Sequence, residues 1–197
     1  MIDKRKAVFF DIDTQYDFMD PNGALYVPGA EEIVDNLKRL VEFARSNGIV
    51  VVATADAHLQ NDPEFDTFPP HCIKGTDGQR KIEATAMQDP FVVEFGYLGD
   101  IPPDRKEYLI EKRTYSFFSN PRADELLRAL GRTQAVVFGV ATDYCVRSAV
   151  EGLMDRGWDV HLVIDAIKPV DEEAERILLD SFQKRGVKLI RTADITG

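Results

Sequence analysis

Apolar positions along this chain follow two alternating periods. Short blocks that are almost continuously apolar are typical of strands buried on both faces of a sheet, and they occupy residues 7–12, 49–55, 108–111, 135–140, 159–164 and 187–190. Between these blocks, apolar residues recur every three or four positions, as in amphipathic helices, over residues 31–46, 121–130, 143–156 and 172–185. This alternation predicts a three-layer, Rossmann-like α/β fold with a mainly parallel central sheet flanked by helices.

Glycine and proline mark several expected boundaries. Gly48 follows the first helical stripe, where glycine commonly ends a helix, and Asn120 with Pro121 is expected to open the second helix. Residues 56–106 follow neither period and are rich in proline, and a loop of this length in a compact domain is usually functional. The length of 197 residues suits a single domain, expected to span residues 1–197.

Polar side chains that could carry chemistry stand just beyond the carboxyl ends of the predicted strands. In chain order they are Asp13, Asp56, His58, Lys112 and Cys145. In open parallel sheets, ligands bind beyond the carboxyl ends of the strands. We therefore expect these side chains to meet in one site.

Composition and charge exclude several classes of function. The net charge of −10 disfavours nucleic acid as a partner, because an acidic surface repels phosphate. No apolar run approaches the roughly 18–20 residues of a membrane span, and the first residues do not have the pattern of a secretory signal. With only two cysteines, Cys72 and Cys145, the chain is expected to keep free thiols in a reducing compartment, the cytoplasm.

Cys145 lies in the first turn of the helix predicted after residues 135–140. Unpaired amides and the positive end of the helix dipole favour a thiolate there, and the same amides can hold an oxyanion. A buried core cysteine is the alternative interpretation. A nucleophilic thiol needs a base, and since His161 lies inside an apolar strand, Asp13 and Lys112 are the candidate partners.

A second group of side chains is typical of a metal site. Asp56 and His58 are two positions apart on an extended segment, so both can face one ion, and the following loop can bring Glu64 and His71 to it. Imidazoles combined with carboxylates suit Zn²⁺, Fe²⁺ or Mn²⁺. A chance Asp-x-His pair in a polar loop is the alternative.

Five blocks of the sequence occur, in the same order, in a known family. They are Asp13-Thr14-Gln15-Tyr16-Asp17-Phe18, Thr54-Ala55-Asp56-Ala57-His58, Phe68-Pro69-Pro70-His71-Cys72, Lys112, and Gly139 through Cys145. With these blocks the chain resembles the isochorismatase-like cysteine hydrolases and, within them, the nicotinamidases, which include pyrazinamidases. The Pro-Pro-His-Cys block and the Asp-x-His pair separate nicotinamidases from relatives that need no metal.

The resemblance implies a catalytic role for each matched residue. Asp13 would be the base, Lys112 its cationic partner and Cys145 the nucleophile. A cis peptide bond between Val140 and Ala141 would turn the amide of Ala141 so that it forms an oxyanion hole with the amide of Cys145.

The resemblance also implies the ligands of one divalent metal ion and the walls of an aromatic pocket. These residues are Asp56, His58, Glu64 and His71 for the metal, and Phe18 and Phe68 for the pocket. Two positions depart from the common pattern: Phe68 stands where many nicotinamidases have Trp, and Glu64 where His is common. Asp62 and Asp66 are close enough in sequence to be rival ligands.

The expected function is hydrolysis of nicotinamide, or a related pyridine carboxamide, to a carboxylate and ammonia through a cysteine thioester. The metal, Zn²⁺ first with Fe²⁺ or Mn²⁺ as alternatives, would hold the pyridine nitrogen. Two other interpretations stay open: a metal-free cysteine hydrolase of a ureido or carbamoyl compound, and a non-catalytic metal-binding module. The expected partner is a small molecule, without nucleic acid or membrane, and the oligomeric state is left open, a homo-oligomer included.

Overall fold

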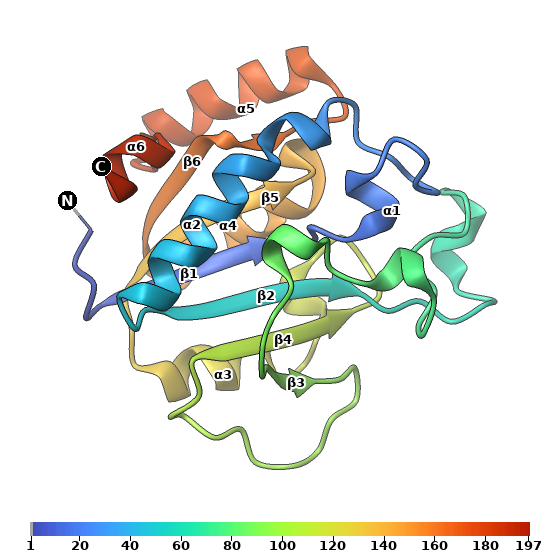
Figure 1. Ribbon diagram of the computed structural model, residues 1–197, viewed down its shortest axis with the longest axis horizontal. Coiled ribbons are helices and arrows are strands. Elements are labelled where there is room, and N and C mark those ends of the chain that lie inside the picture. The colour runs from blue at the N-terminus through green and yellow to red at the C-terminus, as the bar shows by residue number, and fades with distance from the viewer. Residues whose placement is uncertain (1) are drawn as a thin grey trace.

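The central feature of the computed structural model, which describes residues 2–197, is a seven-stranded sheet in the order β3-β4-β2-β1-β5-β6-β7 (Figure 1). Every neighbouring pair of strands is parallel, which confirms the predicted fold class. The strands are β1 (Ala7–Ile12), β2 (Val50–Asp56), β3 (Phe91–Val93), β4 (Glu107–Lys112), β5 (Gln134–Val140), β6 (Asp159–Lys168) and β7 (Lys188–Ile190).

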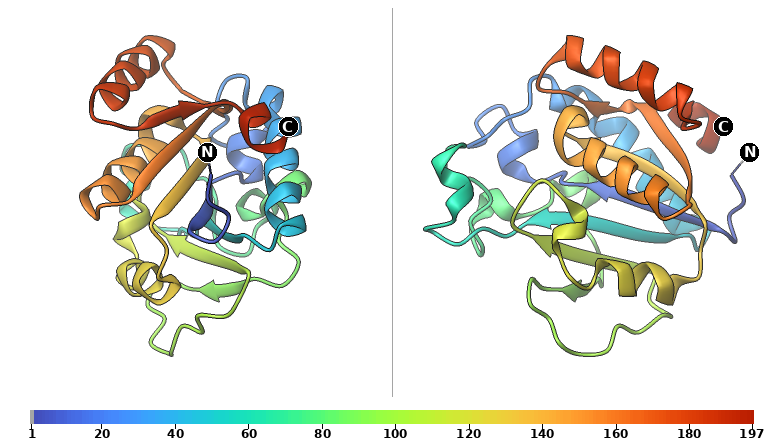
Figure 2. Two further views of the ribbon diagram at one scale, coloured as in Figure 1. Left: turned by 90° about the vertical axis from the view of Figure 1, so that its left-hand side faces the viewer. Right: turned by 180° about the vertical axis from the view of Figure 1, so that it is seen from behind.

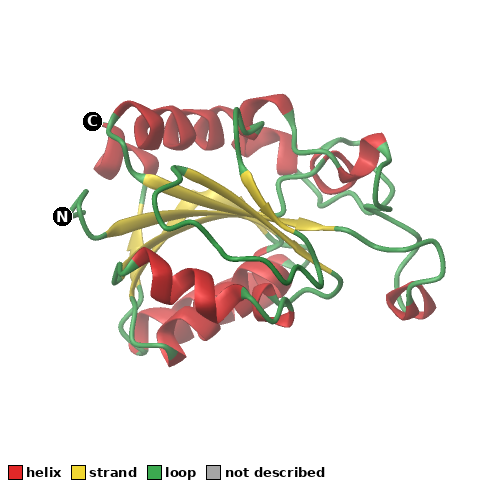
Figure 3. Cartoon of the chain, turned by 90° about the horizontal axis from the view of Figure 1, so that it is seen from below, coloured by secondary structure: helices red, strands yellow, loops and turns green. Residues whose placement is uncertain are grey.

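Helices cover both faces of this sheet, as Figure 3 shows with the sheet seen between two helical layers. One layer holds α1 (Tyr16–Met19), α2 (Val34–Ser46) and α6 (Thr192–Thr196). The other, facing the viewer in the right-hand view of Figure 2, holds α3 (Ala123–Leu130), α4 (Arg147–Asp155) and α5 (Glu172–Lys184).

The two layers exist because side chains of a strand alternate between the faces of the sheet. In β1, Phe9 is buried in the same core as Leu40 of α2, whereas Phe10 is buried in the core that contains Leu126 of α3 and Phe182 of α5. Burying a large apolar side chain of this kind contributes about 1.5–3 kcal/mol. These cores hold the strand ends in place for the site above them.

The expected elements are present, with differences at their ends. The first helix begins with a 3₁₀ turn, Ala30–Ile33, before α2, and Gly48 follows it with a left-handed φ of 63° as predicted. The helix expected from Pro121 starts at Ala123. Short elements escaped the sequence analysis, because three to five residues carry too little periodicity: α1, α6, the edge strand β3 and 3₁₀ turns at Pro63–Asp66, Asp77–Gln79 and Glu83–Thr85.

The strand order changes direction at β1. β1 lies between β2 and β5, and later strands are added to the sheet on both sides of it. In sheets of this kind, ligands bind beyond the carboxyl ends of the strands at such a point. The carboxyl ends of the central strands point to the side where α1 and residues 57–85 lie, away from both termini (Figure 1). Within residues 2–197, no helix has the length and apolar character needed to cross a bilayer.

Candidate active site

The register of the parallel strands brings together the polar residues that follow them. Asp56 and Lys112 are the last residues of β2 and β4 and lie directly opposite each other. Asp13 follows β1, whose last residue Ile12 is level with Gly139 of β5. A Cβ atom on Gly139 would clash with the carbonyl group of Ile12, so this close approach of two strands requires glycine.

Lys112 is the centre of a fully buried charged group. Its ammonium Nζ lies 2.7 Å from Asp13 Oδ2, 2.5 Å from Asp56 Oδ1 and 3.7 Å from Cys145 Sγ, and it donates to the carbonyl of Thr114 at 3.0 Å. Asp13 and Lys112 have no exposed surface. The three predicted catalytic residues are therefore in one cluster, on three different segments of the chain.

Burial and mutual charge set the protonation of this cluster. Burial raises the pKa of Asp13, against the opposing effect of Lys112. Burial disfavours the charged form of Lys112, but Asp13 and Asp56 outweigh it and raise the pKa of the ammonium well above its usual range. Burial would also raise the pKa of Asp56, but Lys112 and the nearby histidines hold it well below its usual range. Lys112 is thus a stable cation between two carboxylates.

Cys145 rests as a thiol. Burial raises the pKa of Cys145 well above its usual range, and the carboxylates of Asp13 and Asp56 add to this effect while Lys112 opposes it. Burial and the two carboxylates therefore outweigh the stabilisation of a thiolate that was expected from the start of the helix. Cys145 lies in a π-helical turn, Thr142–Val146, which precedes α4.

Hydrogen bonds to the side-chain hydroxyl of Thr54 hold Asp13 in position. Thr54 of β2 accepts a hydrogen bond from the Asp13 amide at 3.1 Å and donates one to Asp13 Oδ1 at 2.6 Å.

The peptide bond between Val140 and Ala141 is cis, as the resemblance implied. Ala141 and Cys145 both line the cavity described below.

A compact group of possible metal ligands lies directly beside the cluster. Asp56, His58 and His71 are all buried, and their ligand atoms lie within 4.8 Å of one another. Asp56 Oδ2 is 3.8 Å from Nε2 of each histidine, while Oδ1 of the same carboxylate contacts Lys112.

The two imidazole rings are oriented for coordination through Nε2. The Nδ1 atom of His71 lies 2.8 Å from the carbonyl oxygen of Pro69, and Nδ1 of His58 lies 3.2 Å from Asp62 Oδ2. The contact between Nδ1 of His58 and Asp62 is a close charged contact and not an aligned hydrogen bond, and within residues 2–197 the buried Nε2 of His58 has no hydrogen-bond partner either. Lys112 can neutralise only one of the two buried carboxylates beside it. Unused nitrogen lone pairs and an excess negative charge therefore fit a divalent cation.

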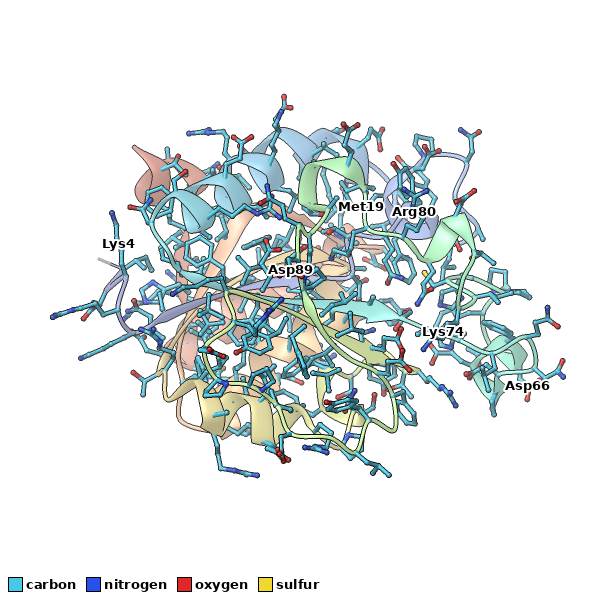
Figure 4. All side chains as sticks on the ribbon, turned by 60° about the horizontal axis from the view of Figure 1, so that its bottom comes forward. Lys4, Met19, Asp66, Lys74, Arg80 and Asp89 are labelled. Carbon is cyan, nitrogen blue, oxygen red and sulfur yellow. The ribbon has the colours of Figure 1, made fainter. Side chains whose placement is uncertain are left out.

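The loop between the two histidines holds three acidic residues in different places. Glu64 is half-buried and lines the cavity described below, but it is not part of the group formed by Asp56, His58 and His71. Burial and the negative charge of Asp56 raise the pKa of Glu64. Asp62 turns inward to His58. Asp66 is exposed and lies at the outer edge of the molecule (Figure 4).

A cavity of about 130 Å³ is lined by both the thiol and part of the group of possible metal ligands. Cys145 and Ala141 line it, as do Asp56 and His71. The remaining walls are mainly apolar or aromatic: Phe18, Leu25, Tyr26, Val27, Phe68, Tyr115, Val140, Tyr144 and Val170, with Glu64 among them. The predicted pocket residues Phe18 and Phe68 flank His71, with ring centroids 5.4 and 6.4 Å from its ring.

Several residues of the site were not assigned by the sequence analysis. The side chain of Gln15 accepts from the Asp56 amide at 2.7 Å and donates to the Asp56 carbonyl at 2.9 Å, and Asp17 Oδ2 accepts from the Cys72 amide at 2.7 Å. Both belong to the motif that follows Asp13, which was the available signal. Of the three tyrosines of the cavity, Tyr144 belongs to the Gly139 through Cys145 block, whereas Tyr26 and Tyr115 come from separate loops and have no comparable signal.

The remaining cysteine and histidine are structural. Cys72 is completely buried in the core beneath α2, and burial raises the pKa of its thiol well above the usual range. His161 lies near the amino end of β6, opposite the site, with Nε2 3.2 Å from Asp159.

The sequence is similar to those of known proteins. A model of the isochorismatase domain matches residues 7–194, which include all seven strands. The chain belongs to the isochorismatase family. The nicotinamidase of Escherichia coli strain K12 is 28% identical to this isochorismatase-family protein over 184 residues, which cover 81% of this chain and 82% of that protein.

Two further similar proteins differ in the activity that their names give. An Arabidopsis thaliana protein named as a probable inactive nicotinamidase is 25% identical over 194 residues, covering 93% of this chain and 91% of that protein. The crystal structure of the pyrazinamidase of Pyrococcus horikoshii in complex with zinc has a TM-score of 0.79 at 28% identity, and covers 94% of this chain and 99% of that chain. Similarity to nicotinamidases alone therefore does not determine whether a protein is active.

Proposed function

We propose that this isochorismatase-family protein is a nicotinamidase, which hydrolyses nicotinamide and related pyridine carboxamides to the carboxylate and ammonia. One observation carries the proposal: the same small, mainly apolar cavity is lined by the Cys145 thiol and by Asp56 and His71, two members of the buried Asp-His-His group. A flat aromatic amide fits this arrangement, with its carboxamide at Cys145 and its ring nitrogen toward His71. The aromatic walls Phe18 and Phe68 suit the faces of such a ring.

A divalent metal belongs to this proposal. Asp56, His58 and His71 would hold it, with Glu64 as a fourth protein ligand, and Zn²⁺ is the first candidate, with Fe²⁺ and Mn²⁺ as alternatives. When bound, such an ion supplies a Lewis acid that orients the ring nitrogen. Positioning of a substrate in this way can lower a reaction barrier by several kcal/mol.

The first half of the reaction forms a thioester. Because Cys145 rests as a thiol, Asp13 takes its proton as the sulfur attacks the carboxamide carbon, and the raised pKa of Asp13 makes it a better base. The amides of Ala141 and Cys145 hold the oxyanion. Asp13 then returns the proton to the nitrogen, the carbon–nitrogen bond breaks and ammonia leaves. Lys112 keeps Asp13 in place and balances the negative charge that is on Asp13 before the proton transfer and again after the proton is returned.

The second half regenerates the enzyme. Asp13 accepts a proton from a water molecule, whose oxygen attacks the thioester carbon. The carbon–sulfur bond breaks, the acid is released, and the proton on Asp13 returns to Cys145. One water is consumed and one ammonia is produced in each cycle.

Ammonia release from nicotinamide tests the proposal. The purified, zinc-loaded protein should form ammonia and nicotinate in equal amounts, and its metal content should approach one ion per chain. Ammonia from a ureido or carbamoyl compound, with none from nicotinamide and no bound metal, would instead identify a metal-free hydrolase. Metal binding without release of ammonia from either class would identify a non-catalytic metal-binding module.

A further inference from the structure

We propose that Asp62 is a positioning residue for the metal site, which orients His58 with one carboxylate oxygen and Glu64 with the other. This inference rests on the metal site of the proposed function. It reverses the simplest interpretation of the sequence, in which Asp62 was only a rival ligand.

The contacts of Asp62 divide between its two oxygens. Oδ2 lies 3.2 Å from Nδ1 of His58, and Oδ1 accepts a hydrogen bond from the backbone amide of Glu64 at 3.2 Å. The His58 side chain is completely buried, and only 8% of the Asp62 side chain is exposed. A carboxylate this deeply buried in a loop would be desolvated without benefit unless it served these two partners.

The contact with His58 selects the tautomer that a metal needs. A neutral imidazole has one N–H group and one lone pair. The Asp62 carboxylate lies 3.2 Å from Nδ1 without an aligned hydrogen bond, and its negative charge favours the proton on that nitrogen, which leaves the lone pair on Nε2, the nitrogen that faces Asp56. Pro69 does the same for His71 with a neutral carbonyl oxygen.

The contact with the Glu64 amide fixes the start of the 3₁₀ turn Pro63–Asp66. Asp62 is the N-cap of this turn, and Pro63 occupies its first position. The conformation of this 3₁₀ turn sets the direction of the Glu64 side chain, which lines the cavity. One residue therefore links the placement of a histidine ligand to that of the proposed fourth ligand.

Three variants separate these roles. Asp62→Asn keeps the size and the N-cap, but its amide group would then point a donor at Nδ1 and favour the tautomer with the proton on Nε2. Asp62→Ser also keeps a good N-cap residue and is too short to reach His58. Asp66→Asn is the matched control, because Asp66 belongs to the same turn, loses the same charge and is exposed.

The measurements are made on chelator-stripped protein titrated with Zn²⁺ and, separately, with Co²⁺, whose visible spectrum reports the geometry of its ligands. Loss of a carboxylate behind a histidine ligand typically lowers metal affinity about 10–100-fold. We expect that loss in Asp62→Asn and Asp62→Ser, with an altered Co²⁺ spectrum. Asp66→Asn should match the native protein, and all stripped forms should have similar melting temperatures.

The outcomes for this inference and for the proposed function are distinct. If both Asp62 variants bind Zn²⁺ as tightly as the native protein, or if Asp66→Asn weakens binding equally, the positioning role is wrong, whatever the activity. A native protein that binds neither ion also overturns it. If the affinities behave as expected but the loaded native protein releases no ammonia from nicotinamide, the positioning role stands and the proposed function fails.

Discussion

Asp56 and Lys112 end two neighbouring parallel strands at the same level, and the Lys112 ammonium lies 2.5 Å from Asp56 Oδ1. The other oxygen of Asp56 faces His58 and His71. A single carboxylate therefore joins the group around Cys145 to the proposed metal site. Any change in the charge at one of these places acts on the other through Asp56.

Removal of the Lys112 charge should destabilise the fold. In Lys112→Met, two buried carboxylates lose the cation between them, and breaking a buried ion pair on one side typically costs about 3–5 kcal/mol. The free energy of unfolding, measured by urea denaturation with a chelator present, should fall by about that amount. Lys184→Met is the control, since its pair with Asp180 is exposed and should change stability by less than about 1 kcal/mol. Equal stability of Lys112→Met and the native protein would show that the buried carboxylates do not depend on this cation.

The nucleophile can be identified by mutation and by labelling. Cys145→Ala should abolish ammonia release from nicotinamide while the protein keeps its melting temperature and its metal, because the side chain lies in the cavity wall and not among the metal ligands. Iodoacetamide should inactivate the native protein by modifying Cys145, and mass analysis of peptides locates the label. A label on Cys72 at the point of inactivation would contradict the assignment.

The base is tested by an isosteric change. Asp13→Asn removes the proton acceptor and should lower kcat about 10²–10⁴-fold, the typical contribution of a general base. Asp35→Asn, on the exposed face of α2, should leave kcat unchanged. Asp13→Asn with a kcat close to native would exclude Asp13. Asp11 and Asp17 are weak substitutes, since Asp11 pairs with Lys81 at 2.9 Å and Asp17 accepts from the Cys72 amide.

The fourth metal ligand is tested on the acidic loop. Glu64→Ala should lower the metal content of the purified protein and raise the KM for nicotinamide, because the metal positions the ring. Asp66→Ala should change neither, since its side chain is exposed. Full occupancy in Glu64→Ala together with loss of metal in Asp66→Ala would reverse the assignment.

Local pattern was sufficient for the architecture. A nearly continuous apolar block such as residues 135–140 is buried on both faces of the sheet. Alternation of such blocks with amphipathic helices is typical of a parallel sheet covered by helices. Parallel strands have their carboxyl ends at one edge, so Asp13, Lys112 and Cys145 were expected to meet, and they lie together around one ammonium.

Tertiary structure alone decided what the loop residues do and which protonation states are present. Asp62, Glu64 and Asp66 alternate in sequence without distinguishing features, but the turn at Pro63 directs the first to His58, the second to the cavity and the third to solvent. The thiol form of Cys145 follows from burial and from two carboxylates that arrive on other strands. Hydrophobic period is a property of neighbouring residues, whereas side-chain direction in a loop and the electrostatic field in a cavity depend on groups distant in sequence. The sequence by itself therefore determined the sheet, apart from its short edge strand β3, and the residues at the carboxyl ends of its strands, and only the folded chain determined which of these residues face one another.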